Sequence, residues 1–260
     1  MVEKLPSLPS ELSERPRYAA QVTEDLLIGG RRLRQAFLQT PMRFAGRDMP
    51  LIRPSDPEPS VILMRSGFAF RSCGLADGRR AILNVVTPGD FIGLDHIVLH
   101  RPIEEITAAN RVGYHQLRAS EVRVLMADRA VTLQILALMA EGRWRGDRLA
   151  TSIGRLDARG RICVLLLDLY DRLRRHGLIS RMTYNLPLTQ EQIADHLGLT
   201  YVHVNRTLRR LREERLVYID RQVVIILDLE GLRELADSLP EAPELPESAE
   251  PINSLPYDAS

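Results

Sequence analysis

The chain has 260 residues, of which 45% are hydrophobic and 27% charged. This length suits one large or two modest domains, and this composition is that of an ordinary soluble globular protein. No apolar run approaches the roughly 18 residues needed to span a bilayer, and the polar start "MVEKLPSLPSELSERPR" is no secretory signal, so we expect a cytoplasmic protein without a membrane partner.

The net charge of +1 hides an uneven distribution. From Leu239 onward there are five acidic residues and no Lys or Arg, so the rest carries 35 basic residues against 29 acidic ones. A body with this excess allows an anionic partner without requiring one. Cys73 and Cys163 form no CxxC pair, which argues against a disulfide framework, a zinc knuckle and a cysteine-ligated iron–sulfur cluster, and favours two free thiols.

In chain order, residues 1–20 carry three prolines and read as a loose arm, followed by helical spacing over Thr23–Leu38 that a Gly pair interrupts. From about residue 43 to 123, short apolar runs alternate with turn signals such as "TPGD", which predicts an antiparallel sandwich or roll. The runs expected to form strands are Val61–Met64, Phe68–Phe70, Ala81–Val86, Phe91–Leu94 and Val112–Leu117.

A long helix follows, with one apolar stripe made of Leu133, Leu136, Ala137, Ala140 and Trp144. A small sheet cannot bury such a helix alone, so we expect part of the stripe to pair with a second copy of the chain; packing wholly within one chain is the alternative. The next helix, in "LDARGRICVLLLDLYDRLRRHGL", ends at a cap formed by His176 and Gly177. We expect a hinge between these helices, near Gly154–Asp157.

The stretch "LTQEQIADHLGLTYVHVNRTLRRLR" contains two short helices. Thr189 and Thr200 are their N-caps, and Gly198 permits the left-handed turn between them, which together indicate a helix-turn-helix. Val204, Leu208 and Leu211 face inward. A small hairpin, Leu216–Ile219 and Val223–Leu227, predicts a wing, while a plain helical hairpin with a solvated arginine face is the simpler alternative.

The outward face of the second helix is polar and basic, with no acid between Asp195 and Glu213. In such motifs the N-terminal residues of the second helix reach base edges and later basic residues meet phosphates. Arg206 is suited to the N7 and O6 atoms of a guanine, and Val202 to a thymine methyl group. The base-reading candidates are Tyr201, Val202, Asn205 and Arg206. The backbone candidates are Thr189, Thr200, His203, Arg209, Arg210 and Arg212.

Three stretches resemble Crp/Fnr-type transcription regulators, over roughly residues 25–235. They are "GFAFRSCGLADGRRAILNVVTPGDFIGL", the long helix with "RLDARGRICVLLLDL", and the helix-turn-helix. The resemblance implies an α+β fold: an N-terminal antiparallel, jelly-roll-like β-roll, a long dimerisation helix and a C-terminal winged helix-turn-helix. It also implies a homodimer that binds a palindromic operator in double-stranded DNA, can contact RNA polymerase, and is no enzyme. At the family's base-reading positions stand Tyr201, Val202 and Arg206, of which only Arg206 follows the familiar members.

The expected domains are a flexible arm (1–22), a sensory β-roll with flanking helices (23–128), the dimerisation helix (129–154), the winged helix-turn-helix (155–238) and a disordered acidic tail (239–260).

This chain differs most from the family pattern in its sensory half. Cyclic-nucleotide-binding members follow the "GDFIG" turn with Glu and hold the phosphate with an Arg-Ser or Arg-Thr step. This chain has Leu94 after Gly93, and Ile106-Thr107 at the step. An unpaired phosphate in a half-buried pocket would cost on the order of 3 kcal/mol or more, so we expect a degenerate effector pocket at these four residues and no control by cyclic AMP.

Other cofactors are not expected. Three roles are conceivable: haem binding by Cys73 and His96, metal binding by His96 and His100, and redox sensing by Cys73. A cysteine in a strand and isolated histidines are more often structural, so we expect none of the three. A cupin-like metal enzyme would need converging His and carboxylate ligands, and His96, His100 and His115 show no HxH pattern. Two modes of control stay open: constitutive DNA binding, or an unidentified small ligand in the roll.

Overall fold

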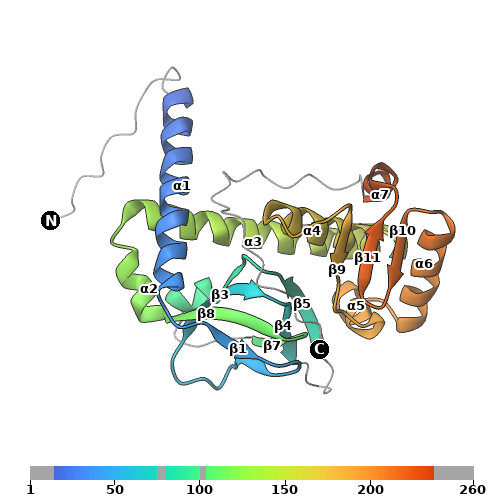
Figure 1. The fold of residues 1–260 in the computed structure, drawn as a ribbon, viewed down its shortest axis with the longest axis horizontal. Helices are drawn as coiled ribbons and strands as arrows, with labels where there is room; N and C mark the ends of the chain where they lie inside the picture. The colour runs from blue at the N-terminus through green and yellow to red at the C-terminus, as the bar shows by residue number, and fades with distance from the viewer. Residues whose placement is uncertain (1–14, 75, 77–79, 100–103, 237–260) are drawn as a thin grey trace.

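The computed structural model describes residues 15–74, 76, 80–99 and 104–236. Its long helix α3 (Arg129–Arg155) lies above a β-roll, and the C-terminal unit packs at one end of that helix (Figure 1). Within the described residues no helix is long and apolar enough to cross a membrane. The expected acidic tail (239–260) and residues 77–79 of the turn "DGRR" lie outside the described residues.

The roll consists of two four-stranded antiparallel sheets. One has the order β1-β8-β3-β6 and the other β2-β7-β4-β5. Alternating side chains of the two sheets meet in a shared apolar core. The strands are β1 (Arg43–Ala45), β2 (Pro50–Ile52), β3 (Ser60–Ser66), β4 (Ala69–Gly74), β5 (Arg80–Val86), β6 (Phe91–Ile92), β7 (Glu105–Ala108) and β8 (Val112–Arg118).

Two details of the roll differ from the expectation. The run Phe91–Leu94 is a strand only over its first two residues, because Gly93 adopts a left-handed conformation (φ 79°) that turns the chain into the 3-10 helix η2 (Leu94–Ile97). Strands β1, β2 and β7 were not anticipated, since three or four residues are too few to show an alternating pattern.

Helix α1 (Arg15–Leu38) begins within the expected N-terminal arm and runs through the Gly pair without a break. Gly29 is needed where α1 crosses α3: a Cβ atom there would lie 2.0 Å from the carbonyl oxygen of Ala130. Gly29 therefore allows two helices to pack closely, and the pair does not interrupt α1. Helix α2 (Ala119–Leu125) links the roll to α3, and its buried Val122 joins residues of α1, α3 and η2 in a second core.

The C-terminal unit contains α4 (Ala158–Arg175), α5 (Gln190–Leu197), α6 (Tyr201–Glu213), α7 (Leu229–Ala236) and a three-stranded sheet. The sheet has the order β10-β11-β9, with β9 (Thr183–Asn185), β10 (Val217–Asp220) and β11 (Val223–Ile226). Only Leu156 and Asp157 separate α3 from α4, at the expected hinge, and Asp157 caps α4 by accepting a hydrogen bond from the Gly160 amide at 2.9 Å.

The C-terminal unit and the roll share one apolar core. Phe68, Phe70, Ile82 and Val85 of the roll pack in the same buried cluster as the inner faces of α4, α5 and α6. A polar link joins the same surfaces, because the His196 Nδ1 atom lies 3.1 Å from the Ile82 carbonyl oxygen and donates to it. The two units are therefore held together by a continuous packed surface in addition to the short α3–α4 link.

Candidate nucleic-acid interface

Local capping fixes the geometry of the α5–α6 pair. The Thr189 hydroxyl accepts from the Gln192 amide at 3.2 Å, and the Gln192 side chain accepts from the Thr189 amide at 2.8 Å, which completes a capping box at the start of α5. Gly198 ends α5 in the left-handed region (φ 62°), and the Thr200 hydroxyl accepts from the His203 amide at 3.3 Å to begin α6. The short turn leaves α6 fixed at the protein surface.

Helix α6 has one buried and one exposed face. Val204, Thr207 and Leu211 are buried, and Leu208, expected to face inward, packs against the same core while remaining half-buried. The exposed face carries the residues that the sequence singles out on this helix. They are Tyr201, Val202, His203, Asn205, Arg206, Arg209, Arg210 and Arg212.

The base-reading candidates lie together on the first two turns of α6. Tyr201 and Val202 remain 51% and 68% exposed, which leaves an apolar surface available to a partner outside the chain. The Asn205 side-chain amide donates to the Gln190 side chain at 3.0 Å, so it bridges α6 to α5. Asn205 would have to exchange this bond to reach a base.

The arginines of α6 differ in their surroundings. Arg209 and Arg210 pair with Glu213 and Glu214 one turn later, at 2.9 and 3.0 Å, and the Arg212 guanidinium lies 4.5 Å from the Tyr218 ring centroid. Arg206 makes no hydrogen bond or ion pair with any residue in the described part of the chain. Its planar set of donors is therefore open to an external acceptor.

The wing is a tight hairpin. Val217 pairs with Ile226 and Asp220 with Val223, which leaves Arg221 and Gln222 as the two turn residues. Both have positive φ (44° and 71°), as a two-residue type I′ turn requires. The prediction from sequence identified the two strands of this hairpin and missed β9, which pairs with β11. It also overlooked Arg221, an exposed cation at the tip of the wing.

The four residues of the expected effector pocket are apolar or internally bonded. Leu94 and Ile106 are 7% and 2% exposed, and they belong to different core clusters. The Thr107 hydroxyl donates to the Glu105 carboxylate at 3.3 Å. Gly93 is tightly packed, since a Cβ atom at this position would lie 2.5 Å from the Ser60 carbonyl oxygen. These positions therefore support the sheets and η2: Leu94 packs with residues of α1 and α3, and Ile106 packs in the core between the two sheets.

One group in the roll could hold a metal ion. Ligand atoms of Asp95, His96 and Glu104 lie within 4.8 Å of one another. The His96 Nδ1 atom donates to the Ser60 carbonyl at 2.9 Å, which leaves Nε2 as the nitrogen with a lone pair. Sequence spacing did not indicate this group, because Glu104 is not adjacent to His96 along the chain. The other histidine weighed with it, His100, lies outside the described residues.

The apolar stripe on α3 is divided between the protein interior and the surface. Leu133, Ala137 and Trp144 are half-buried, while Leu136 (54% exposed) and Ala140 face outward. Met139, 38% exposed, extends the outward patch and was not singled out in the sequence. The most exposed residues of this apolar surface are thus Leu136, Met139 and Ala140.

Comparisons with known proteins agree with this architecture. Residues 160–235 match the model of the Crp-like helix-turn-helix domain. The nitrogen fixation regulation protein FixK of Azorhizobium caulinodans is 30% identical over 206 residues, covering 77% of this chain and 80% of that protein. FixK of Rhizobium meliloti is 30% identical over 164 residues, covering 63% and 72% respectively. The transcriptional regulatory protein btr of Bordetella pertussis is 26% identical over 190 residues, covering 73% and 78%.

Among solved structures, FixK2 from Bradyrhizobium japonicum aligns with a TM-score of 0.67 and 22% identity, covering 75% of this chain and 96% of that one. This likeness confirms the fold: a roll of antiparallel sheets, helices, and a C-terminal helix-turn-helix. The relatives are regulators of transcription and not enzymes. With two FixK relatives at 30% identity and a matching DNA-binding domain, the chain belongs to the Crp/Fnr family of transcription regulators.

Proposed function

We propose that this regulator acts as a homodimer that inserts two copies of α6 into successive major grooves of a palindromic operator. The observation that carries the proposal is the outer face of α6, where exposed apolar, amide and guanidinium groups lie together on the first two turns. A protein–DNA interface needs this combination, because base edges offer both methyl groups and hydrogen-bonding atoms.

We assign base reading to Tyr201, Val202, Asn205 and Arg206, with Arg206 on a guanine. The backbone contacts are assigned to a larger set that surrounds them: Thr189, Thr200, His203, Arg209, Arg210 and Arg212. Glu213 and Glu214 hold Arg209 and Arg210 in place, and these exposed pairs can exchange for phosphate at little cost. Arg221 at the wing tip is added as a further phosphate contact.

Dimerisation is assigned to the outward patch of α3. Leu136 and Met139 are large apolar side chains exposed on a helix of 27 residues, which provides ample length for a parallel pairing. A two-fold dimer must hold its recognition helices about 34 Å apart, so the pairing of α3 sets the half-site spacing.

We infer that cyclic AMP does not control this protein in the manner of the cyclic-nucleotide-binding members. Leu94 and Ile106 are buried hydrocarbon at the positions that would bind ribose and phosphate, and they supply neither a carboxylate nor a cation. A buried phosphate without a counter-charge is strongly disfavoured. The alternative of constitutive DNA binding is favoured by the same observation, and a gel shift without any additive distinguishes it from control by another ligand.

The test is operator binding by the full chain, measured by fluorescence anisotropy on a site obtained by binding selection. Arg206→Ala should cost about 1–3 kcal/mol and relax the preference at one base pair of each half-site. Arg209→Ala serves as the matched control and should weaken binding equally for all sequences, with a smaller salt dependence. If Arg206→Ala also weakens all sequences equally, its assignment to a base is wrong.

A further inference from the structure

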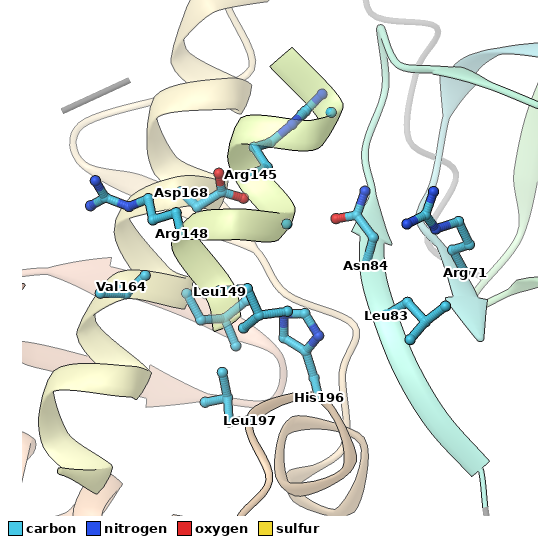
Figure 2. A pocket seen from close by; sticks show the side chains of 13 residues that line it. Arg71, Leu83, Asn84, Arg145, Arg148, Leu149, Val164, Asp168, His196 and Leu197 are labelled. Carbon is cyan, nitrogen blue, oxygen red and sulfur yellow. The ribbon is translucent and has the colours of Figure 1, made fainter. Parts of the chain in front are cut away.

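A cavity lies where the roll, the long helix and the C-terminal unit meet. Figure 2 shows side chains of β4 and β5 on one side of it and those of α3, α4 and α5 on the other. Its volume is about 70 Å³. A single water needs roughly 10–15 Å³ of such space, so the cavity has room for a small oxyanion. Its polar lining residues are Arg71, Asn84, Arg145, Arg148, Asp168 and His196.

The charge of this lining is positive. Three arginines face one acid, and that acid, Asp168, already accepts a hydrogen bond from Arg172 at 3.1 Å. Arg145 lies 3.6 Å from the nearest Asp90 oxygen, and Arg71 lies 3.9 Å from Glu104. Arg145 also lies 4.0 Å from Glu141. These separations are too long for hydrogen bonds, so these carboxylates leave donors of both guanidinium groups unused within the described residues.

Two of the unused donors are buried. The Nε atoms of Arg71 and Arg145 have almost no exposed surface and no hydrogen-bond partner among the described residues. A buried donor without an acceptor is costly, and more so when it is charged. Oxygens of an anion would satisfy donors of this kind with charge-assisted hydrogen bonds, which are the strong ones.

We propose that this cavity binds a small oxyanion, a phosphate or carboxylate group, and that this anion is an effector of the regulator. The site is separate from the expected cyclic-nucleotide pocket, because Gly93, Leu94, Ile106 and Thr107 are not among its lining residues. The anion site itself stands on the geometry alone; its role as an effector rests on the proposed DNA-binding function.

The position of the cavity explains how an anion would reach the DNA-binding surface. His196 and Leu197 belong to α5, the first helix of the helix-turn-helix, and Leu83 and Asn84 belong to β5. Beside the cavity, the hydrogen bond from His196 to the Ile82 carbonyl joins these two elements. A ligand that contacts both walls stabilises the arrangement in which they are closed, and this arrangement sets the position of α6.

Anion binding is measured by isothermal titration calorimetry on the full chain, with sodium phosphate in one arm, sodium malonate in the other, and sodium chloride of equal ionic strength as the blank. We expect saturable binding of one anion per chain, and the arm that binds more tightly identifies phosphate or carboxylate as the preferred group. Arg71→Gln should lower the affinity at least about tenfold, the equivalent of one charge-assisted hydrogen bond.

Arg80→Gln is the matched control, because Arg80 lies on β5, the strand that lines the cavity, and faces Asp195 of α5 at 3.9 Å, yet does not line the cavity itself. The anion affinity of Arg80→Gln should stay within about twofold of that of the unmodified chain, well short of the tenfold change that corresponds to about 1.4 kcal/mol.

A second pair of variants keeps every charge. Gly146→Leu fills the cavity from α3, and Gly154→Leu adds the same side chain to α3 away from the cavity. A Cβ atom at either glycine meets no atom within 4 Å.

The proposal is overturned if neither anion gives saturable heat, or if the members of either pair lose affinity alike. Operator binding is measured separately, with and without the anion. A chain that binds its operator but neither anion refutes the inference and leaves the proposed function intact. A chain that binds the anion but shows the same operator affinity with and without it retains the site and refutes its role as an effector.

Discussion

Replacing Asp90 with Asn should release a buried arginine that joins the two halves of the molecule. Asp90, in the turn after β5, forms an ion pair with Arg172 of α4, whose side chain is only 3% exposed. Arg172 also donates to the Val85 carbonyl at 2.9 Å and to Asp168 at 3.1 Å. Removing one partner of a buried pair costs about 3–5 kcal/mol, and since Asp168 remains as a counter-charge we expect the lower end, about 3 kcal/mol.

Thermal unfolding followed by circular dichroism checks this value. At about 2–4 °C per kcal/mol for a chain of this size, the melting temperature should fall by about 6–12 °C. Asp147→Asn is the control, because its i,i+4 pair with Arg143 is exposed on both sides and should be worth about 0.3–0.5 kcal/mol. A double-mutant cycle with Arg172→Met isolates the pair, and a coupling below about 0.5 kcal/mol would refute the reasoning.

The pair also has a defined pH range. Burial raises the pKa of the Asp90 carboxyl, but the charges of Arg172 and Arg145 together lower it further, so the net pKa lies below the ordinary value. A carboxyl whose pKa is lower in the folded than in the unfolded chain contributes stability above the unfolded pKa, near about 3.9, and loses it as the pH falls through the folded value. The effect of Asp90→Asn should therefore be complete at neutral pH and shrink below about pH 4.

Three further results are expected. Gly29→Ala should destabilise by about 3 kcal/mol or more in urea unfolding, because of the backbone clash at α3, while Gly154→Ala, in open space, should be neutral or stabilising. Burial lowers the pKa of His176 to about 4, so between about pH 6.5 and pH 4 the unfolded chain binds more protons than the folded one. The melting temperature should therefore decrease as the pH is lowered through this window, and His176→Gln should make this decrease smaller. Burial raises the pKa of Cys163 to about 12, so iodoacetamide should label Cys73 first, as mass spectrometry can show.

The helix-turn-helix could be predicted because its signals are local. Thr189 and Thr200 cap helices that begin one residue later, and Gly198 adopts the left-handed turn that its type favours. Hydrogen bonds and dihedral preferences within a few residues determine all three, so tertiary packing adds little. The hydrogen bond between Asn205 and Gln190 joins α6 to α5. It could not be predicted from the sequence because it depends on the angle between the two helices.

The start of α1 and the junction between the units could not be predicted. Prolines suggested an unstructured arm, yet Pro16 occupies the first turn of α1, where a helix tolerates it. Asp90 and Arg172 are 82 residues apart, and nothing in either local pattern indicates the other. The same holds for Arg71, Arg145 and His196, which meet in one cavity only because the C-terminal unit packs against β5.

This packing has a consequence for control. Moving α6 relative to the roll would expose the apolar surface that Phe70 and Ile82 share with α4 and α5. It would also separate Arg172 from the carboxylate of Asp90. Packed interfaces with a buried ion pair switch between discrete arrangements and do not drift. A signal must therefore supply differential binding energy for one arrangement, at the level of a few kcal/mol. An oxyanion held by Arg71 on the roll and Arg145 on α3 contacts both sides of that interface, whereas a ligand confined to the roll would need a further mechanical link.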